Sequence, residues 1–157
     1  MLIYIFYMQK VVENYDFSLW FINSYRAIIP DMRYVKYNPN PIKKTAGDCV
    51  VRMLTIVTEE SWEKCYSNLV LKGLEMGEMP SANVVWISYL RDLGFTRHSI
   101  PNTCPDCYTI KDFCADNPQG LFVVGTGSHV VAVYNGSYYD SWDSGDEIPI
   151  FYLREGK

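Results

Sequence analysis

Two segments of this chain carry residue types that together could perform nucleophilic catalysis. One runs from His129 to Trp142 and contains two alternating apolar stretches separated by Asn135-Gly136, a dipeptide typical of two-residue hairpin turns. With this turn, His129 lies opposite Trp142 in the neighbouring strand. Because side chains alternate along a strand, His129 and Asp140 share one sheet face at near-diagonal positions. The hairpin therefore predicts a histidine oriented by a carboxylate, the base half of a catalytic triad.

Cys49 is the candidate nucleophile. It follows a Gly-Asp pair and precedes the apolar run 50–54, a pattern that predicts a loop entering a helix with Cys49 in the first turn. Backbone N–H groups at a helix start favour a thiolate and can stabilise an oxyanion. Cys49, His129 and Asp140 thus make a candidate Cys-His-Asp triad.

Each of these residues also has a plainer interpretation. Cys49 could be an ordinary buried cysteine, and His129 a core histidine whose ring is satisfied by Asp140. Asp143 competes with Asp140 as the acid partner, but the same hairpin register places Asp143 on the opposite face. His98 is the second histidine and has no carboxylate partner that can be read from the sequence, so His129 is the expected base.

These motifs resemble those of papain-like cysteine peptidases. The strand that starts at His129 is similar to the family's His-(Ala/Val)-Val-x-x-Val strand, and residues 140–142 are similar to its Asn-Ser-Trp element, with Asp140 in place of Asn. The order of Cys, His and Asp along the chain also agrees. More narrowly, Tyr37 to Tyr152, about three quarters of the chain, resembles small papain-fold proteins of phages and gut bacteria, which share a Gly-Asp-Cys-x-x-Arg start and a Ser-His-Val-Val strand.

The resemblance implies a papain-like α+β fold, with N-terminal helices and the nucleophile helix packed on a C-terminal antiparallel sheet. It implies a cysteine hydrolase, a peptidase or an amidase/isopeptidase, whose substrate is a peptide or protein. Cys49 would form a thioester acyl-enzyme, His129 would act as base and then acid, and Asp140 would fix the imidazole tautomer. Transfer of the acyl group to an amine would use the same triad. Trp142 is either plain sheet packing or, as in the family, a cover that shields the His-Asp pair from water.

One position departs from the family pattern. Papain-like enzymes place an oxyanion-hole Gln six residues before the nucleophile, where this chain has Lys43. Asn40 is the candidate amide donor in its place, with Asn38 as the alternative, or the backbone N–H of Cys49 acts with another group. The alternative function is therefore a catalytically inactive papain-like module that binds a peptide or protein partner.

The remaining periodicity predicts helices followed by strands. The helices run from Trp62 to Gly73, from Ser81 to Gly94, and from a Thr109-x-x-Asp capping box to Pro118. The strands are predicted at 121–126, 129–134, 137–142 and 148–153. Helices followed by an antiparallel meander make an α+β arrangement.

Length and composition predict one main domain. The chain has 157 residues, 48% of them hydrophobic, which suffices for one substantial core. Residues 1–31 have no counterpart in the resemblance, so we expect the hydrolase domain to span 32–157. Residues 1–31 are either an N-terminal extension or an amphipathic helix that packs on this domain.

Charge and targeting signals exclude several partner classes. The net charge is −4 without a basic stripe, which argues against nucleic acid. The apolar run from Leu2 to Met8 is too short for an export signal or a membrane span. The five cysteines are an odd number and cannot all pair within one chain, so a reducing cytoplasm is the expected location.

Cys104 and Cys107 form a Cys-x-x-Cys pair that suggests other chemistry. With His98 and Cys114 they could bind zinc in a zinc-stabilised interaction domain, or the pair could be redox-active. A single pair is weak evidence for either, because Cys114 falls in a predicted short helix and no thioredoxin-like strand precedes the motif. We expect no metal and no cofactor. The acidic loop 143–147 suggests calcium only weakly.

Overall fold

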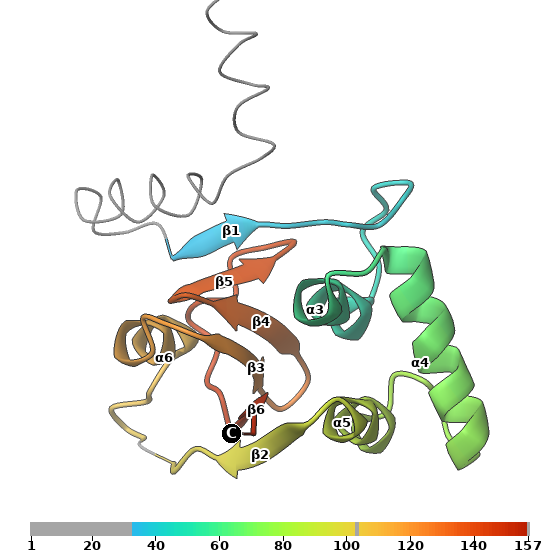
Figure 1. Cartoon of the computed structure of the whole chain (residues 1–157). Coiled ribbons are helices and arrows are strands. Elements are labelled where there is room, and N and C mark those ends of the chain that lie inside the picture. The colour runs from blue at the N-terminus through green and yellow to red at the C-terminus, as the bar shows by residue number, and fades with distance from the viewer. Residues whose placement is uncertain (1–32, 103, 157) are drawn as a thin grey trace, which may run out of the picture. The chain divides into compact units, whose positions relative to one another are not determined.

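The computed structural model describes residues 33–102 and 104–156, so the predicted extension 1–31 lies outside the described residues. The described part contains four helices and six strands in a mixed α+β architecture (Figure 1). In chain order these are β1 (Tyr34–Lys36), α3 (Cys49–Thr58), α4 (Trp62–Met76), α5 (Asn83–Asp92), β2 (Phe95–Ser99), α6 (Ile110–Asp116), β3 (Leu121–Gly125), β4 (Val130–Tyr134), β5 (Ser137–Asp140) and β6 (Phe151–Glu155).

The six described strands form one sheet in the order β1-β5-β4-β3-β6-β2. β1 pairs with β5 in parallel, whereas the other neighbouring strands are antiparallel. The sheet is therefore not purely the C-terminal antiparallel meander that was predicted, because β1 and β2 join it from earlier in the chain. β1 has three residues, and in β2 only Phe95 is buried. Neither strand has the alternating apolar pattern that identifies a strand in a sequence.

The hairpin register is confirmed. Tyr134 pairs with Ser137, and Asn135 and Gly136 both have positive φ, 48° and 71°, as the tight turn favoured in hairpins requires. The ladder is shorter than predicted, since β4 begins at Val130 and β5 ends at Asp140. His129 therefore precedes the paired residues, so the alternation of side chains along a strand does not fix the direction of its side chain.

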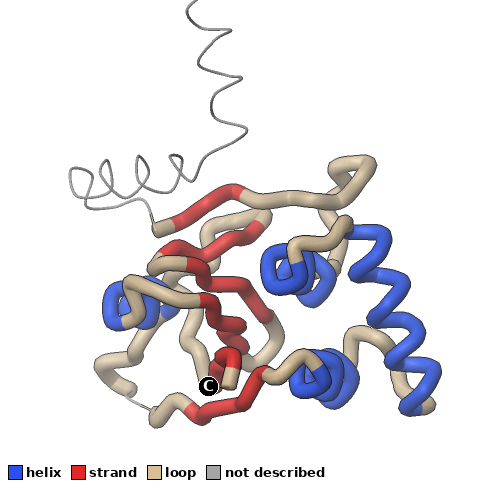
Figure 2. The backbone as a smooth tube through the Cα atoms, viewed as in Figure 1, coloured by secondary structure: helices blue, strands red, loops and turns tan. Residues whose placement is uncertain are grey.

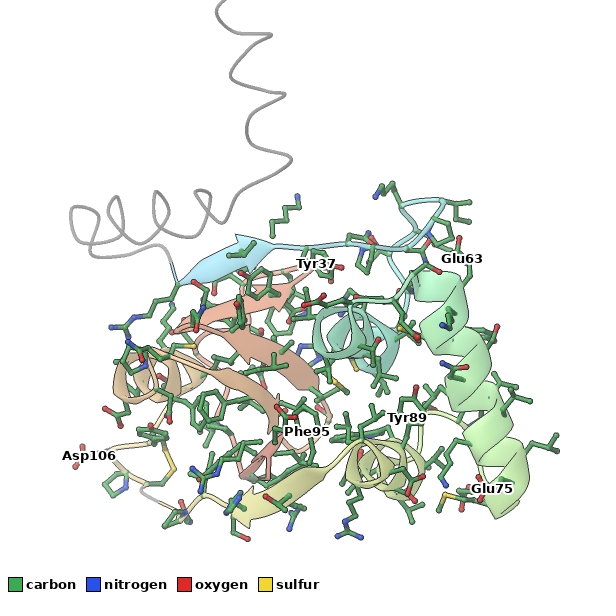
Figure 3. All side chains as sticks on the ribbon, in the orientation of Figure 1. Tyr37, Glu63, Glu75, Tyr89, Phe95 and Asp106 are labelled. Atoms are coloured by element: carbon green, nitrogen blue, oxygen red, sulfur yellow. A yellow bond between two sulfur atoms is a disulfide. The ribbon has the colours of Figure 1, made fainter. Side chains whose placement is uncertain are left out.

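Helices cover both faces of the sheet (Figures 1 and 2), and each face has its own apolar core. On one face, side chains from α3, α4 and α5 pack with Val130 and Ala132. On the other face, α6 packs with Val131 and Val133. Side chains fill the space on both sides of the sheet (Figure 3). α3 thus lies on the Val130 face of β4, which brings its first residue to the start of that strand.

The prediction that Gly73 ends a helix is wrong. α4 continues to Met76 and ends at Gly77, which has a left-handed conformation with φ 66°. A Cβ on Gly73 would lie 2.8 Å from the carbonyl oxygen of Glu78 and 3.2 Å from Pro80. Gly73 is therefore a packing residue that lets the chain return closely against α4.

The helix starts agree better with the sequence. Cys49 is the first residue of α3, as predicted. Ser61 caps α4 by accepting a hydrogen bond from the N–H of Lys64. The capping box at α6 is confirmed, since Thr109 and Asp112 each bond the other's backbone N–H. Start signals succeed because a cap depends on residues within one turn.

We expect Gly73→Ala to lower the free energy of unfolding by about 1–2 kcal/mol, because overpacking against the Glu78 backbone outweighs the better helix propensity of alanine. Ser67→Ala, on the exposed side of the same helix, is the control and should change stability by less than about 0.5 kcal/mol. Urea denaturation of both variants measures the difference. A Gly73→Ala protein as stable as the wild type would contradict the packing role.

Candidate active site

The structure brings Cys49, His129 and Asp140 together. His129 Nε2 lies 2.6 Å from Asp140 Oδ2, and interaction with the His129 side chain lowers the pKa of the Cys49 thiol. Because Nε2 is engaged by Asp140, Nδ1 is the ring nitrogen available to the thiol. The three side chains come from the start of α3, the residue before β4 and the end of β5. His129 is thus hydrogen-bonded to Asp140 and interacts electrostatically with Cys49.

Asp140 is 1% exposed and accepts hydrogen bonds at both oxygens. Oδ1 accepts from the N–H of Ser141 at 2.7 Å and from Arg52 Nη2 at 3.1 Å. Oδ2 accepts from Ser144 Oγ at 2.7 Å in addition to His129. Burial raises the pKa of Asp140, but the hydrogen bonds from His129 and Ser144 outweigh burial and hold the pKa below its usual value. Asp140 is therefore ionised at neutral pH.

His129 is poised to carry a positive charge. Burial lowers the pKa of the imidazole, but hydrogen bonds to Asp140 and Cys49 and the charges of these two groups outweigh burial. The net result raises the pKa of His129 to about 9. A histidine with this pKa is protonated at neutral pH and can donate its proton to a leaving group.

Cys49 is correspondingly poised to lose its proton. Burial raises the pKa of the thiol, but the hydrogen bond to His129, the charge of His129, the N–H of Val130 and the charge of Arg52 together lower the pKa below its usual value. Asp48 makes no side-chain capping bond to α3, so no Asp48 cap occupies the N–H groups of the first turn. The site thus favours a thiolate beside an imidazolium.

The sequence analysis gave Arg52 no role beyond its place in the Gly-Asp-Cys-x-x-Arg start, and it did not identify Ser144 as a member of the site. Arg52 is 5% exposed and bridges the carboxylates of Asp48 and Asp140. The i,i+4 spacing of Asp48 and Arg52 is a signal that could have revealed this pair. Asp48 Oδ2 also accepts from Trp62 Nε1 at 2.9 Å. Ser144 carries no comparable local signal.

A cavity of about 420 Å³ opens beside the triad. Cys49 and His129 line it, with walls from the loop before α3, the start of α5 and the turn before β4. The lining residues are Thr45, Ala46, Gly47, Cys49, Val50, Arg52, Ser81, Asn83, Trp86, Thr126, Gly127, Ser128, His129, Val130, Ser141, Trp142 and Phe151. The Trp142 ring lies 5.4 Å from the His129 ring, centroid to centroid, and Trp142 is 47% exposed. The indole thus covers one side of the imidazole.

Asn40 is not among the residues that line this cavity. It is buried, and its Oδ1 accepts hydrogen bonds from the N–H groups of Ile42 at 3.1 Å and Lys44 at 3.3 Å. Asn38 accepts in turn from the N–H of Asn40. These short amide side chains stabilise the turn before α3, and the structure does not place Asn40 beside Cys49.

The other titratable candidates have separate partners. Asp143 accepts hydrogen bonds from the Tyr138 hydroxyl and the N–H of Gly145, so Asp140 is the aspartate that contacts His129. His98 lies near the Thr96 hydroxyl and stacks on Tyr152. Neither residue joins the site.

Cys104 and Cys107 are joined in a disulfide, which removes both thiolates from any zinc ligand set. The described residues contain no group of three His, Cys, Asp or Glu side chains placed to hold a metal.

Because disulfides are rare in a reducing cytoplasm, the bond between Cys104 and Cys107 does not support the predicted cytoplasmic location, which stays a prediction. Within the described part of the chain, every helix is too short or too polar to cross a bilayer.

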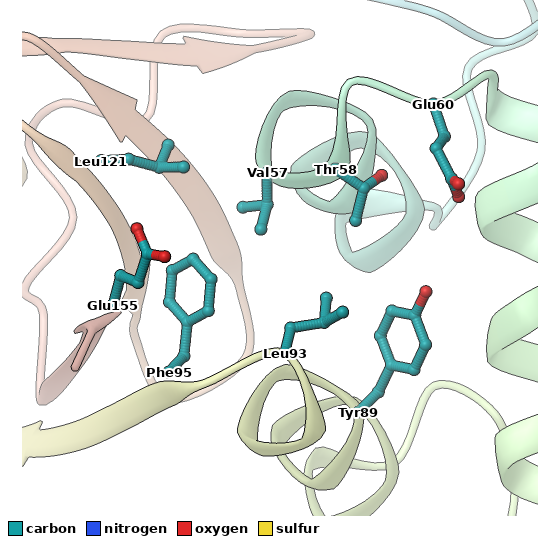
Figure 4. Close-up of a pocket in the computed structure, with 8 residues that line it drawn as sticks. All are labelled: Val57, Thr58, Glu60, Tyr89, Leu93, Phe95, Leu121 and Glu155. Atoms are coloured by element: carbon teal, nitrogen blue, oxygen red, sulfur yellow. The ribbon is translucent and has the colours of Figure 1, made fainter. Parts of the chain in front are cut away.

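A second cavity, of about 340 Å³, lies at the opposite end of α3 (Figure 4). It is lined by Val57, Thr58, Glu60, Tyr89, Leu93, Phe95, Leu121 and Glu155. These residues include neither a thiol nor an imidazole. Cys49 and His129 line the cavity at the N-terminal end of α3 and not this second one.

Comparison with known proteins assigns no family, since no family model, curated protein or solved structure matches the chain. The residues and geometry of the site are therefore the basis for a function. The site combines a low-pKa thiol, a charged imidazole and a buried carboxylate beside an open cavity.

We expect Cys49 to react with iodoacetamide at roughly pH 6 at least about tenfold faster than Cys65, because a free thiol with a pKa of roughly 8.5 is almost fully protonated there. Burial raises the pKa of Cys65, which makes it the internal control. His129→Ala should remove the advantage of Cys49. Mass spectrometry of the alkylated peptides measures both rates, and equal rates in the wild type would rule out an activated thiol.

Ser144→Ala should lower the free energy of unfolding by about 1–2 kcal/mol, because it removes one donor from a buried carboxylate. It should also reduce the alkylation rate of Cys49 by loosening Asp140. Ser141→Ala is the matched control, since Ser141 bonds Asp140 through its backbone N–H and keeps that bond. If both variants behave alike in denaturation and alkylation, the Ser144 hydroxyl does not support the site.

Proposed function

We propose that this protein is a papain-like cysteine hydrolase that cleaves amide or isopeptide bonds of peptides or proteins. The observation that carries the proposal is that Cys49 and His129 line the same cavity while His129 is hydrogen-bonded to the buried Asp140, an arrangement that lowers the pKa of the Cys49 thiol. The packing of α3 on the face of the sheet that holds Val130 and Ala132 supports a papain-like arrangement of nucleophile helix and sheet.

In this proposal the reaction proceeds in two halves. The Cys49 thiolate attacks the carbonyl carbon of the amide, and the π electrons move to the carbonyl oxygen. His129 then donates its proton to the leaving nitrogen as the C–N bond breaks, which leaves a thioester on Cys49. Neutral His129 next takes a proton from water, the water oxygen attacks the thioester, and the C–S bond breaks. The acid product departs, and the thiolate and imidazolium are restored.

Two donors are proposed for the oxyanion and the substrate backbone. The N–H of Cys49 lies in the first turn of α3, which has no side-chain cap. Asn83 lines the same cavity, and its Oδ1 accepts from Trp86 Nε1 at 3.0 Å. This bond directs the Asn83 oxygen to the indole and leaves the amide nitrogen as a donor. Asn83 takes the place that the sequence suggested for Asn40.

The cavity lining favours an uncharged peptide segment. Apart from Cys49, Arg52 and His129, the described residues that line it have no ionisable side chains. Arg52 is already paired with Asp48 and Asp140. Aromatic side chains of Trp86, Trp142 and Phe151 and small polar groups make up much of the wall. Such a surface suits apolar contacts and a few backbone hydrogen bonds.

An activated ester tests the chemistry directly. We expect a stoichiometric burst of alcohol release from a p-nitrophenyl ester and a thioester adduct on Cys49 detectable by intact mass, because the thiolate attacks faster than the acyl-enzyme is hydrolysed. Cys49→Ala should abolish both signals, and Asp140→Asn should slow the burst without changing the adduct site. Cys65→Ala, which removes a buried thiol elsewhere, should retain both.

The alternative is an inactive papain-like module that binds a peptide or protein partner. Lys43 at the position of the family's oxyanion Gln is the feature that favours it. This alternative predicts neither burst nor adduct in the wild-type protein. A burst that persists in Cys49→Ala would also exclude the triad as its source.

A further inference from the structure

The Arg52 side chain links the segment around Cys49 to Asp140, the carboxylate that is hydrogen-bonded to His129. It lies one turn after Cys49 on α3, and its guanidinium is buried with side-chain exposure of 6%. Nη1 bonds Asp48 Oδ1, and Nη2 bonds Asp140 Oδ1 at 3.1 Å. One planar group therefore joins the residue before the nucleophile to the carboxylate that holds His129. Such forked bonding fixes orientation as well as charge.

The buried groups form a row of alternating charges. Arg52 forms ion pairs with Asp48 and Asp140, Asp140 bonds His129, and the raised pKa of His129 and the lowered pKa of Cys49 favour an imidazolium beside a thiolate at the end of the row. Asp48, Arg52 and Asp140 are 8%, 5% and 1% exposed. Water screens these charges little at this burial, so each one acts on its neighbours more strongly than at the surface.

We propose that Arg52 and Asp48 are positioning residues that together set the charge balance of the Cys49–His129 pair. Arg52 holds the Asp140 carboxylate in place and favours the thiolate. Asp48 anchors Arg52 and partly cancels its charge. The inference rests on the proposed role of Cys49 as the nucleophile, but it concerns residues that act through Asp140 and through their charges.

Other groups around this row come from several elements. Trp62 at the start of α4 donates to Asp48, and Ser144 donates to Asp140. Tyr34 on β1 also faces the charges of Asp140 and Asp143, and burial with these charges raises its pKa. The tyrosine is therefore neutral throughout the acidic and neutral range. The charged side chains that pair with or lie next to Asp140 and Cys49 are those of Asp48, Arg52 and His129.

The test is the pH profile of Cys49 alkylation in the full chain, with iodoacetamide as the probe. Asp48→Asn removes the anion and should move the acid limb of the profile to lower pH by at least about half a unit. Arg52→Met removes the cation and should move the limb to higher pH by a similar amount. Arg52→Lys keeps the charge but not the forked bonds, and should leave the limb closer to that of the wild type than Arg52→Met does.

The opposite signs separate an electrostatic role from a merely structural one, because structural damage would move both profiles in the same direction. Lys72→Met and Asp92→Asn are matched controls, since this ion pair lies on α4 and α5 outside the cavity, and neither should shift the limb. If Arg52→Met does not fold, Asp48→Asn decides alone. An acid limb at lower pH than in the wild type supports the inference, and a limb at the same or higher pH overturns it.

The outcomes also separate this inference from the proposed function. The wild-type profile can have an acid limb at lower pH than a free thiol while Asp48→Asn and Arg52→Met leave this limb unshifted or shift it in the same direction. This result overturns only the role of Arg52 and Asp48. A wild-type profile equal to that of a free thiol overturns the nucleophile itself, and the inference falls with it.

Discussion

The buried carboxylate of Asp140 is the group on which the arrangement of this site depends. An ionised carboxylate that loses contact with water is costly unless hydrogen bonds and opposite charges replace the solvent. Here the replacements come from α3, from the residue before β4 and from the loop after β5. The partners of Asp140 are therefore complete only when all of these segments have reached their folded positions.

α3 contributes both to the apolar core and to the position of Cys49. Val50, Val51 and Leu54 bury one side of the helix in the core against β4, while Cys49, which is partly exposed, is its first residue. Asp48 occupies the N-cap position but turns its side chain to Arg52 and Trp62 instead of capping the helix. A side-chain cap would typically add about 1 kcal/mol of helix stability. Asp48 instead anchors the Arg52 guanidinium one turn from Cys49.

Local signals predicted the parts of the structure that depend on neighbouring residues. The Asn135-Gly136 turn, the start of α3 at Cys49 and the Thr109 capping box were all readable, because each is decided within a few residues. β1 and β2 were missed because they are short and mostly polar, and their strand conformation comes from partners supplied by β5 and β6. Gly73 was misread because glycine ends helices and also permits close packing, and only the position of Glu78 distinguishes the two.

The sequence by itself predicted that His129 and Asp140 lie near each other, since a two-residue turn sets the register of a hairpin, but His129 precedes the paired residues and its bond to Asp140 is decided by the folded structure. It also placed Cys49 at a helix start. Only the tertiary structure decided that α3 covers the Val130 face, that Asn40 serves its own loop, and that Ser144 and Arg52 complete the shell of Asp140. Arg52 and Asp140 are separated by 88 positions. Periodicity and capping report on contacts within a turn or a strand, whereas the pairing of buried charges depends on which distant groups lose water together.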